Sequence, residues 1–256
     1  MTTGQKAEAL QKARRECRAI KQFSLEEPSF SVADGYEVQR LGFELAIGAG
    51  EQLCGYKMGL TSRAKQRDVQ VFESIHGYLL SSMETVKGGT VETGSRIHPR
   101  VEPEVAVILK TPLSGPGVTL RDVVAAIDQV LPALEIIDSR FEAFSFRLAD
   151  VIADNTSASG FMLGRGNLAG RLSELNLLGV ALRKNGEIVE TGAPAAVLGD
   201  PLLSVVELAN SLGREGRRIE PGQVILTGGI TASITFAKGD CIETVWPDES
   251  LVFRAV

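Results

Sequence analysis

The sequence is poor in the residues that carry most nucleophilic and zinc chemistry. Among its 256 residues are two histidines, His76 and His98, and three cysteines, Cys17, Cys54 and Cys241. The cysteines are odd in number, far apart and outside any Cys-x-x-Cys spacing, so free buried thiols in a reducing compartment are expected in preference to disulfides or a zinc site. A Ser-His-Asp triad would have little to draw on. Chemistry in this chain must therefore depend on carboxylates, lysine, hydroxyl groups or a metal bound through oxygen.

The chain also lacks long apolar runs and an excess of basic charge. No run approaches the roughly 18 apolar residues that a membrane span needs, and the charged stretch 1–23 has no apolar signal-peptide core. The formal net charge is −5, with lysine and arginine scattered along the chain, which argues against a nucleic-acid partner. We therefore expect a cytoplasmic protein without membrane or nucleic-acid partners.

The first part of the chain has a mostly helical pattern. Residues 2–50 are predicted to be helical, and the run 31–34 is typical of a helix start. A short strand is expected at 54–60, between glycines. The charged stretch 63–71 is compatible with a short helix or a loop.

The rest of the chain alternates between short β-prone runs and glycine or proline. Asn185-Gly186 between two such runs is typical of a two-residue hairpin. Helices are predicted at 120–130, opened by Thr119, and at 201–212, with Asp200 as N-cap. The β-prone runs are 105–109, 134–137, 158–163, 177–183, 223–227 and 241–246.

Three glutamates lie in or beside apolar runs. Glu102 and Glu104 alternate along a predicted strand and therefore point to one face. Two like charges at the mouth of a core repel each other and lose hydration, and a divalent cation removes both penalties. Oxygen ligands without nearby cysteine or histidine favour Mg²⁺, Mn²⁺ or Ca²⁺ over zinc. Glu135, inside an apolar strand, needs a metal or an arginine as partner.

The spacing of these glutamates leaves a second interpretation open. Glu102 and Glu104 could be solvated at a strand end, and Glu135 could form a salt bridge. Asp138 alternates to the opposite face from Glu135, and Arg140 is close enough in sequence to pair with Asp138.

Six blocks of sequence resemble the hydratase/decarboxylase group of the fumarylacetoacetate-hydrolase superfamily, enzymes of the meta-cleavage catabolism of aromatic compounds. They occur in the family's order and span the chain from about residue 31 to the C-terminus. The resemblance implies an α+β fold, a mixed β-sandwich or roll with a smaller helical N-terminal part at 1–85 and a catalytic β domain at 86–256. The blocks are GYKMGLTS (55–62), HPRVEPEVA (98–106), LPALEIIDSR (131–140), ADNTSASGFMLG (153–164), KNGEIVETGAPAAVLGDP (184–201) and TGGIT (227–231).

The resemblance also implies a metal site and a choice between two activities. Glu102, Glu104 and Glu135 match the family's ligands for Mg²⁺ or Mn²⁺. One activity decarboxylates 2-oxohex-3-enedioate, a small 2-oxo dicarboxylic acid, and the other hydrates the resulting 2-hydroxypenta-2,4-dienoate. Ile75 stands where hydratases carry an acidic residue, and the run 137–146 lacks their tryptophan, so decarboxylation is favoured. Ser159-Gly160 is closer to the hydratase pattern, and hydration stays the alternative.

Further site residues are implied by the same blocks. Lys57 lies in an apolar strand, where burial makes it paired or shifted in pKa; the alternative is a surface lysine with a buried stem. Asp154 and Ser157 are candidate catalytic residues, although a turn or helix cap would use them equally well. The candidate substrate-binding residues are Leu60, Ile75, Arg140, Gly228 and Gly229.

Several of these assignments have structural alternatives. Arg140 could bind the distal carboxylate of the substrate, but pairing with Asp138 is favoured. The two glycines could bring backbone N–H groups close to a substrate carboxylate or could form a plain tight turn.

The resemblance further implies a homo-oligomer and a possible complex with a dienol hydratase. Hydrolysis of an acylpyruvate C–C bond would need a water-activating base, and none is evident. An inactive partner subunit would be free to lose its ligands, whereas this chain keeps its three glutamates and Lys57.

Overall fold

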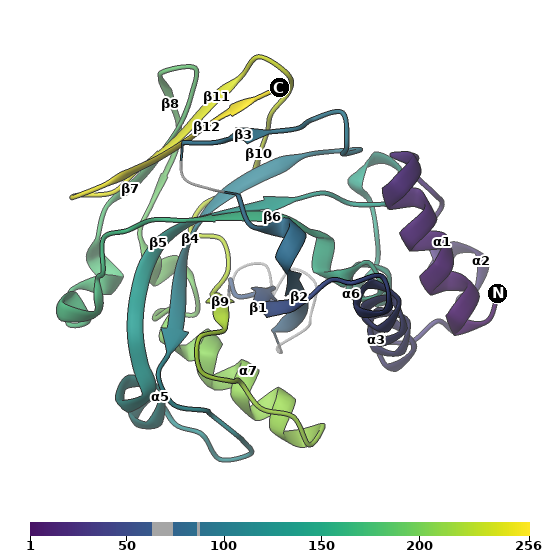
Figure 1. The fold of residues 1–256 in the computed structure, drawn as a ribbon, viewed down its shortest axis with the longest axis horizontal. Coiled ribbons are helices and arrows are strands. Elements are labelled where there is room, and N and C mark those ends of the chain that lie inside the picture. The colour runs from purple at the N-terminus through teal and green to yellow at the C-terminus, as the bar shows by residue number, and fades with distance from the viewer. Residues whose placement is uncertain (63–73, 86–87) are drawn as a thin grey trace.

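The computed structural model describes residues 1–62, 74–85 and 88–256, so the predicted segment 63–71 lies outside the described residues. Two β-sheets and two groups of helices make up the described chain (Figure 1). In the larger sheet the strand order is β2-β1-β9-β4-β5-β6, with β10 paired to β4. Its strands are β1 (Leu53–Gly59), β2 (Ile75–Leu80), β4 (Arg100–Leu109), β5 (Ile127–Ile137), β6 (Ala158–Leu163), β9 (Val224–Leu226) and β10 (Ile234–Thr235).

The smaller sheet has the strand order β3-β12-β11-β7-β8. Its strands β12 and β7 contact β5 and β4 of the larger sheet. The hairpin between β7 and β8 is confirmed, because Asn185 and Gly186 both adopt positive φ, 55° and 88°, as the tight turn of a twisted hairpin requires. The strands are β3 (Thr90–Val91), β7 (Val180–Lys184), β8 (Glu187–Gly192), β11 (Cys241–Val245) and β12 (Ser250–Ala255).

The helices form two groups at different parts of the larger sheet (Figure 1). One group contains α1 (Thr3–Glu16), α2 (Phe23–Glu26), α3 (Val32–Gly48) and α6 (Leu148–Ala153), and α3 packs on both α1 and α6. In the other group α5 (Leu120–Ala126) packs on α7 (Leu202–Arg214). Short 3₁₀ segments are η1 (Ser81–Met83), η2 (Glu142–Phe144), η3 (Asn155–Ser157), η4 (Ala169–Arg171), η5 (Leu175–Leu177) and η6 (Pro194–Ala196).

The start of α3 follows the predicted capping chemistry. Ser31 is the N-cap of α3: its hydroxyl accepts from the Asp34 amide at 3.2 Å, and the Asp34 carboxylate accepts from the Ser31 amide at 2.8 Å. This reciprocal pair satisfies two amides that have no partner within the helix. At α7 the predicted N-cap is wrong by one residue, because Pro201 is the N-cap; Asp200 precedes it, and its carboxylate accepts from the Leu202 amide at 2.9 Å.

The helix predicted over 120–130 is wrong beyond Ala126, because β5 begins at Ile127. From Ile127 onward the chain pairs with β4 in an antiparallel ladder that runs to Ile137. A proline inside a helix removes a hydrogen bond and clashes with the preceding turn, and Pro132 lies within this strand. Pairing with β4 therefore overrides the local helical pattern.

Three clusters of buried hydrophobic residues stabilise the described chain, and two of them are large. The larger one lies between the sheets and α5 and α7. The smaller one joins α1, α3 and α6, where the rings of Phe30 and Phe141 meet Phe23 edge-on at 5.8 and 5.5 Å between centroids. Among the described residues, no helix combines the length and the apolar character that a membrane span requires.

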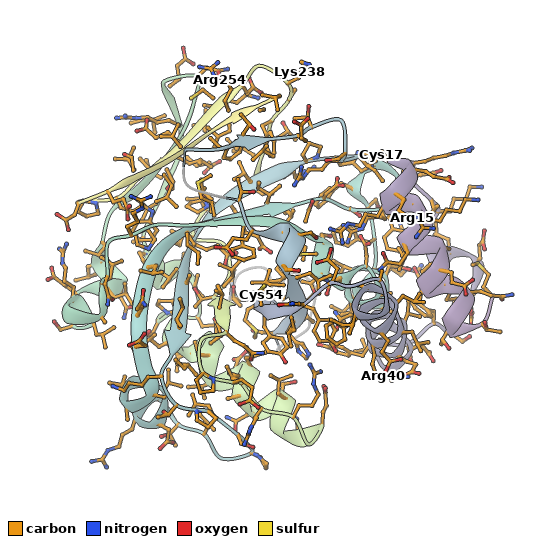
Figure 2. The ribbon with its side chains drawn as sticks, viewed as in Figure 1. Arg15, Cys17, Arg40, Cys54, Lys238 and Arg254 are labelled. Carbon is orange, nitrogen blue, oxygen red and sulfur yellow. The ribbon has the colours of Figure 1, made fainter. Side chains whose placement is uncertain are left out.

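The cysteines and the boundary between the two predicted regions can be placed in this fold. Cys17, Cys54 and Cys241 are free, as expected, but all three are partly exposed, so the prediction that they are buried is wrong. Figure 2 shows Cys17 and Cys54 on separate elements. Strand β1 precedes the predicted boundary at residue 85, yet it pairs with β9 from the second region in a parallel register. The division into two domains stays a prediction.

Candidate metal centre and active site

Three glutamates meet on one face of the larger sheet. The antiparallel register of β4 and β5 places Glu102 directly opposite Glu135, and Glu104 lies two residues further along β4 on the same face. One carboxylate oxygen from each residue lies within 4.8 Å of the others. Glu104 and Glu135 are fully buried, and Glu102 is 8% exposed. The interpretation of Glu102 and Glu104 as solvated residues at a strand end is therefore wrong.

The buried carboxylates perturb one another. Burial raises the pKa of Glu104 well above its usual value, and the charges of Glu135 and Glu102 raise it further. Burial also raises the pKa of Glu135 to about 7, although the Lys57 ammonium opposes this shift. Within the described part of the chain, Glu104 Oε1 and Glu135 Oε1 have no hydrogen-bond donor. These oxygens fit a hard divalent cation, which would supply the missing charge and ligation at once.

Lys57 lies beside the glutamates. Its Nζ atom is 3.0 Å from Glu135 Oε2 and donates to the Thr156 carbonyl oxygen at 3.0 Å. Burial alone would lower the pKa of Lys57, but the charges of Glu135, Glu104 and Glu102 outweigh it and raise the pKa. The lysine is 3% exposed, so it is not the surface lysine of the alternative interpretation. It is an ammonium fixed at the edge of the carboxylate cluster.

Two glycines approach the metal-ligand candidates closely. The Gly228 amide donates to Glu104 Oε2 at 2.7 Å, and Gly228 has a φ of 114°, in the region that favours glycine. A Cβ atom on Gly229 would lie 2.3 Å from Glu102 Oε2. The Gly228 amide therefore orients Glu104, and the lack of a side chain at Gly229 leaves room for Glu102. Their predicted contact with substrate stays a prediction.

The segment after α6 is a strained turn. Asn155, Thr156 and Ser157 all have left-handed backbone conformations, with φ of 51°, 51° and 56°. Each costs roughly 1–2 kcal/mol for a residue with a side chain, and such strain is concentrated at functional sites. The Ser157 hydroxyl is buried and finds no partner in the described chain, and its catalytic role stays a prediction.

Arg140 and Asp154 form a buried ion pair behind this turn. The Arg140 Nε atom pairs with Asp154 Oδ1, and the Arg140 amide donates to Oδ2 at 2.9 Å. Burial raises the pKa of Asp154 to about 6, against the opposing effect of Arg140. Asp138 instead accepts from the amides of Ile97 and His98. The favoured pairing of Arg140 with Asp138 is therefore wrong, because Asp154, distant in sequence, occupies the guanidinium.

An apolar wall adjoins Lys57. Ile75 pairs with Gly59 across β1 and β2, and Gly77 pairs with Lys57, so Ile75 lies on the same face as Lys57. Ile75 forms a small cluster with buried Val151 and Ile152 and with partly buried residues. Those partly buried residues are Tyr36, Leu60, Phe146 and Leu148.

His76 lies on the opposite face of β2, because it pairs with Met58 and not with Lys57. Burial lowers the pKa of His76 to about 4, and Arg217 adds to this shift. His76 is therefore a neutral core residue at neutral pH and does not belong to the carboxylate cluster.

The sequence analysis did not identify Thr156 or Thr61 as contributors to this region. Thr156 acts through its carbonyl oxygen, which accepts from Lys57, and a backbone role leaves no signal in residue type. A Cβ atom on Gly228 would lie 1.9 Å from Thr61 Oγ1. The proximity of Thr61 to the glycine segment depends on the parallel pairing of β1 with β9.

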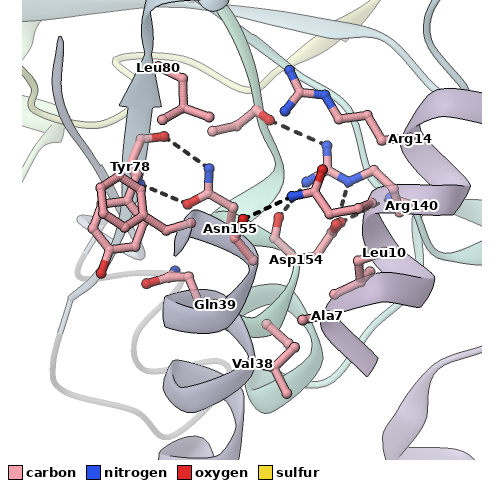
Figure 3. Close-up of a pocket in the computed structure, with 15 residues that line it drawn as sticks. Ala7, Leu10, Arg14, Val38, Gln39, Tyr78, Leu80, Arg140, Asp154 and Asn155 are labelled. Carbon is pink, nitrogen blue, oxygen red and sulfur yellow. Dashed lines mark hydrogen bonds and ion pairs between the residues drawn. The ribbon is translucent and has the colours of Figure 1, made fainter. Parts of the chain in front are cut away.

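A cavity lies on the far side of the Arg140–Asp154 pair, between α1 and α3 and the end of β2 (Figure 3). Its lining includes Arg14, Tyr78 and Asn155. Figure 3 shows the Asn155 side chain directed at the backbone of Tyr78. The turn thus has one side toward Lys57 and another toward this cavity.

Comparisons with known proteins give close relatives over nearly the whole chain. The chain is 43% identical to a 4-oxalocrotonate decarboxylase of Pseudomonas putida over 238 residues, 92% of this chain and 89% of that protein. It is 38% identical to a 2-oxo-hept-4-ene-1,7-dioate hydratase of Escherichia coli, over 91% of this chain and 90% of that protein. No family model matches the chain.

A solved structure agrees with these sequence relatives. It is a 4-oxalocrotonate decarboxylase from Pseudomonas putida G7 complexed with magnesium and adipate, and it superposes with a TM-score of 0.96 at 41% identity. The match covers 99% of this chain and 97% of that one.

Proposed function

The chain belongs to the hydratase/decarboxylase family of the fumarylacetoacetate-hydrolase superfamily, and on that basis we propose that it decarboxylates 2-oxohex-3-enedioate (4-oxalocrotonate) to 2-hydroxypenta-2,4-dienoate and CO₂ with Mg²⁺. The observation that carries the proposal is the buried cluster of Glu102, Glu104 and Glu135 with Lys57 beside it. Mn²⁺ has the same preference for oxygen ligands and is the alternative cation.

The three glutamates would hold the cation, and the Gly228 amide would orient Glu104 as a ligand. When bound, the cation would act as a Lewis acid on the 2-oxo group of the substrate and stabilise charge that develops there. One oxygen of Glu135 forms an ion pair with the Lys57 ammonium at 3.0 Å, and the other oxygen has no hydrogen-bond partner in the described chain. This arrangement lets Glu135 serve both the cation and the ammonium.

Lys57 supplies a fixed donor next to the reacting group. An ammonium has three protons; Lys57 donates one to the Thr156 carbonyl oxygen, and its nitrogen lies 3.0 Å from Glu135 Oε2 in an ion pair. A remaining proton would be donated to the oxygen on which negative charge accumulates as CO₂ leaves, where a preorganised donor is most effective. Ser157, with its buried hydroxyl, is the proposed group for relaying a proton to the dienolate. Asp154 would assist by holding the turn that carries Ser157.

Ile75 and Leu60 favour decarboxylation over hydration. They form an apolar wall with Val151 and Ile152, and none of these four side chains could act as a base that activates water for addition to the alkene. It would also keep water from the dienolate. The hydratase relative keeps hydration as the alternative activity.

The experiment is an assay of CO₂ release from 2-oxohex-3-enedioate with purified protein, with EDTA and with added Mg²⁺. CO₂ release that depends on Mg²⁺ is expected. A parallel cuvette follows the absorbance of 2-hydroxypenta-2,4-dienoate. Loss of that absorbance, without CO₂ release from the dicarboxylate, would make the chain a hydratase.

The assembly and location of the protein are also part of this proposal. We propose a homo-oligomer in the cytoplasm that can associate with a dienol hydratase, on the basis of the family resemblance. Size-exclusion chromatography coupled to light scattering, run with and without a purified hydratase, would measure both associations. A single monomeric species in both runs would exclude them.

A further inference from the structure

We infer that Asn155 is a positioning residue: its side-chain amide holds the left-handed turn 155–157 in the one conformation that aligns Lys57 and Ser157 for the reaction. This inference rests on the proposed function and extends it to Asn155, whose side chain bonds to Tyr78 and not to the three glutamates in the described chain.

Three consecutive left-handed residues with side chains do not persist without external support. None of the three is glycine, and their φ angles lie between 51° and 56°. The support must come from contacts that the turn makes with its surroundings.

The side chain of Asn155 supplies a two-point clamp to β2. Its Oδ1 atom accepts from the Tyr78 amide at 2.7 Å, and its Nδ2 atom donates to the Tyr78 carbonyl at 2.9 Å, as Figure 3 shows. An amide is the side chain that offers a donor and an acceptor side by side. Asparagine is also among the residues that best tolerate a left-handed backbone.

Residues next to Asn155 also help to hold the turn in place. The Thr156 hydroxyl donates to the His76 carbonyl at 2.9 Å. A Cβ atom on Gly77 would lie 2.6 Å from the Asn155 carbonyl oxygen, so glycine is needed there for the turn to approach β2. On the opposite side, Arg140 donates to the carbonyls of Asp154 and Ala158, which flank the turn.

The clamp determines where the chemical groups lie. It fixes the Thr156 carbonyl, which accepts one of the three protons of Lys57 at 3.0 Å. It also fixes the backbone of Ser157, whose carbonyl accepts from the Asp138 amide at 2.9 Å. Loss of the clamp should release both groups, because each depends on the turn for its position.

The test compares Asn155→Ala with Asn185→Ala. Asn185 is a matched control: its φ is 55°, and its side chain also makes two hydrogen bonds, to Asp240 and to the Cys241 amide. It lies in the β7–β8 hairpin of the smaller sheet. Both variants are expected to lower the melting temperature by similar amounts.

The kinetic results should separate the two variants. For Asn155→Ala, kcat for CO₂ release is expected to fall about 10- to 100-fold, the effect of a small misplacement of catalytic groups. KM and the Mg²⁺ dissociation constant should change less than about threefold, because the glutamates are untouched. Asn185→Ala should keep the wild-type kcat. An unchanged kcat in folded Asn155→Ala would overturn the inference.

A second variant and a crystallographic comparison test the inference if the first experiment gives no answer. If Asn155→Ala does not fold, Asn155→Asp keeps the size and the acceptor to the Tyr78 amide but removes the donor to its carbonyl, and the same loss of kcat is expected. If wild-type protein releases no CO₂, the proposed function fails. Crystal structures of wild type and variant then decide the inference alone, since an unchanged Lys57–Thr156 contact in the variant would overturn it.

Discussion

Two buried ionic clusters flank the turn 155–157, and they differ in how their charges are satisfied. In the first, Glu102, Glu104 and Glu135 face one ammonium, and carboxylate oxygens are left without donors in the described chain. In the second, Arg140 and Asp154 neutralise each other. The guanidinium also donates to two backbone carbonyls.

The difference indicates which cluster is built for a ligand. A buried charge without a partner is costly and needs an external group. A buried ion pair whose hydrogen bonds are all formed costs little free energy to keep buried, but removing one partner is strongly destabilising. The glutamate cluster therefore fits a cation, whereas the Arg140–Asp154 pair stabilises the backbone around it. The following predictions test this contrast, from the largest expected effect to the smallest.

Breaking the satisfied cluster should have the largest effect on folding. Arg140→Leu leaves Asp154 buried and unpaired, and the free energy of unfolding in urea should fall by about 3–5 kcal/mol. As a control, Arg171→Leu removes ion pairs with Glu174 and Asp248 at the surface and should change stability little. Equal losses in both variants would contradict a structural role for the buried pair.

Removing one charge from the glutamate cluster should raise the stability of the metal-free protein, whereas breaking the Arg140–Asp154 pair should lower it. Without metal, Glu104→Gln is expected to be more stable than wild type by about 1 kcal/mol or more, because it relieves repulsion among buried carboxylates. With Mg²⁺ at a hundred times its dissociation constant, wild type should gain about 2.7 kcal/mol. The variant should gain far less. Thermal unfolding with EDTA and with Mg²⁺ measures both, and a variant less stable than wild type in EDTA would refute the contrast.

Stability should also depend on pH through His76, which lies outside both clusters. Its pKa is about 4 in the folded protein against 6.5 in the unfolded chain, so between these values the unfolded state binds the extra proton. The stability is therefore complete above pH 6.5 and is lost as the pH falls toward 4. The loss should be about 2 kcal/mol by a pH of about 5. The unfolding free energies of wild type and His76→Gln, measured by urea titration, should depend differently on pH over this window. Parallel pH profiles would exclude His76 as the origin of the pH dependence.

The face shared by Glu102 and Glu104 could be predicted from sequence because side chains alternate along a strand. The need of Glu135 for a partner could be predicted from its apolar neighbours. These inferences depend on residues close in sequence, and the β4–β5 ladder confirmed their geometry.

The clamp around the turn could not be predicted in the same way. Asp138 and Asp154 are equally good partners for Arg140 by residue type, and only the tertiary fold brings Asp154 to it. The left-handed conformation of Thr156 and Ser157 goes against their local preference, so no propensity indicates it. The start of β5 at Ile127 was missed for a related reason, since pairing with β4 decides it.

The smallest effect should come from the backbone that shapes the unsatisfied cluster. In Gly229→Ala the new Cβ would lie 2.3 Å from Glu102 Oε2, so the carboxylate must move away from its position beside Glu104 and Glu135. Isothermal titration should show Mg²⁺ affinity about tenfold weaker, equivalent to about 1.4 kcal/mol. The control is Gly179→Ala, where a Cβ meets nothing within 4 Å, and its affinity should match wild type. Unchanged affinity in Gly229→Ala would mean that Glu102 has room to adjust and that the close approach of this glycine does not set the geometry of the site.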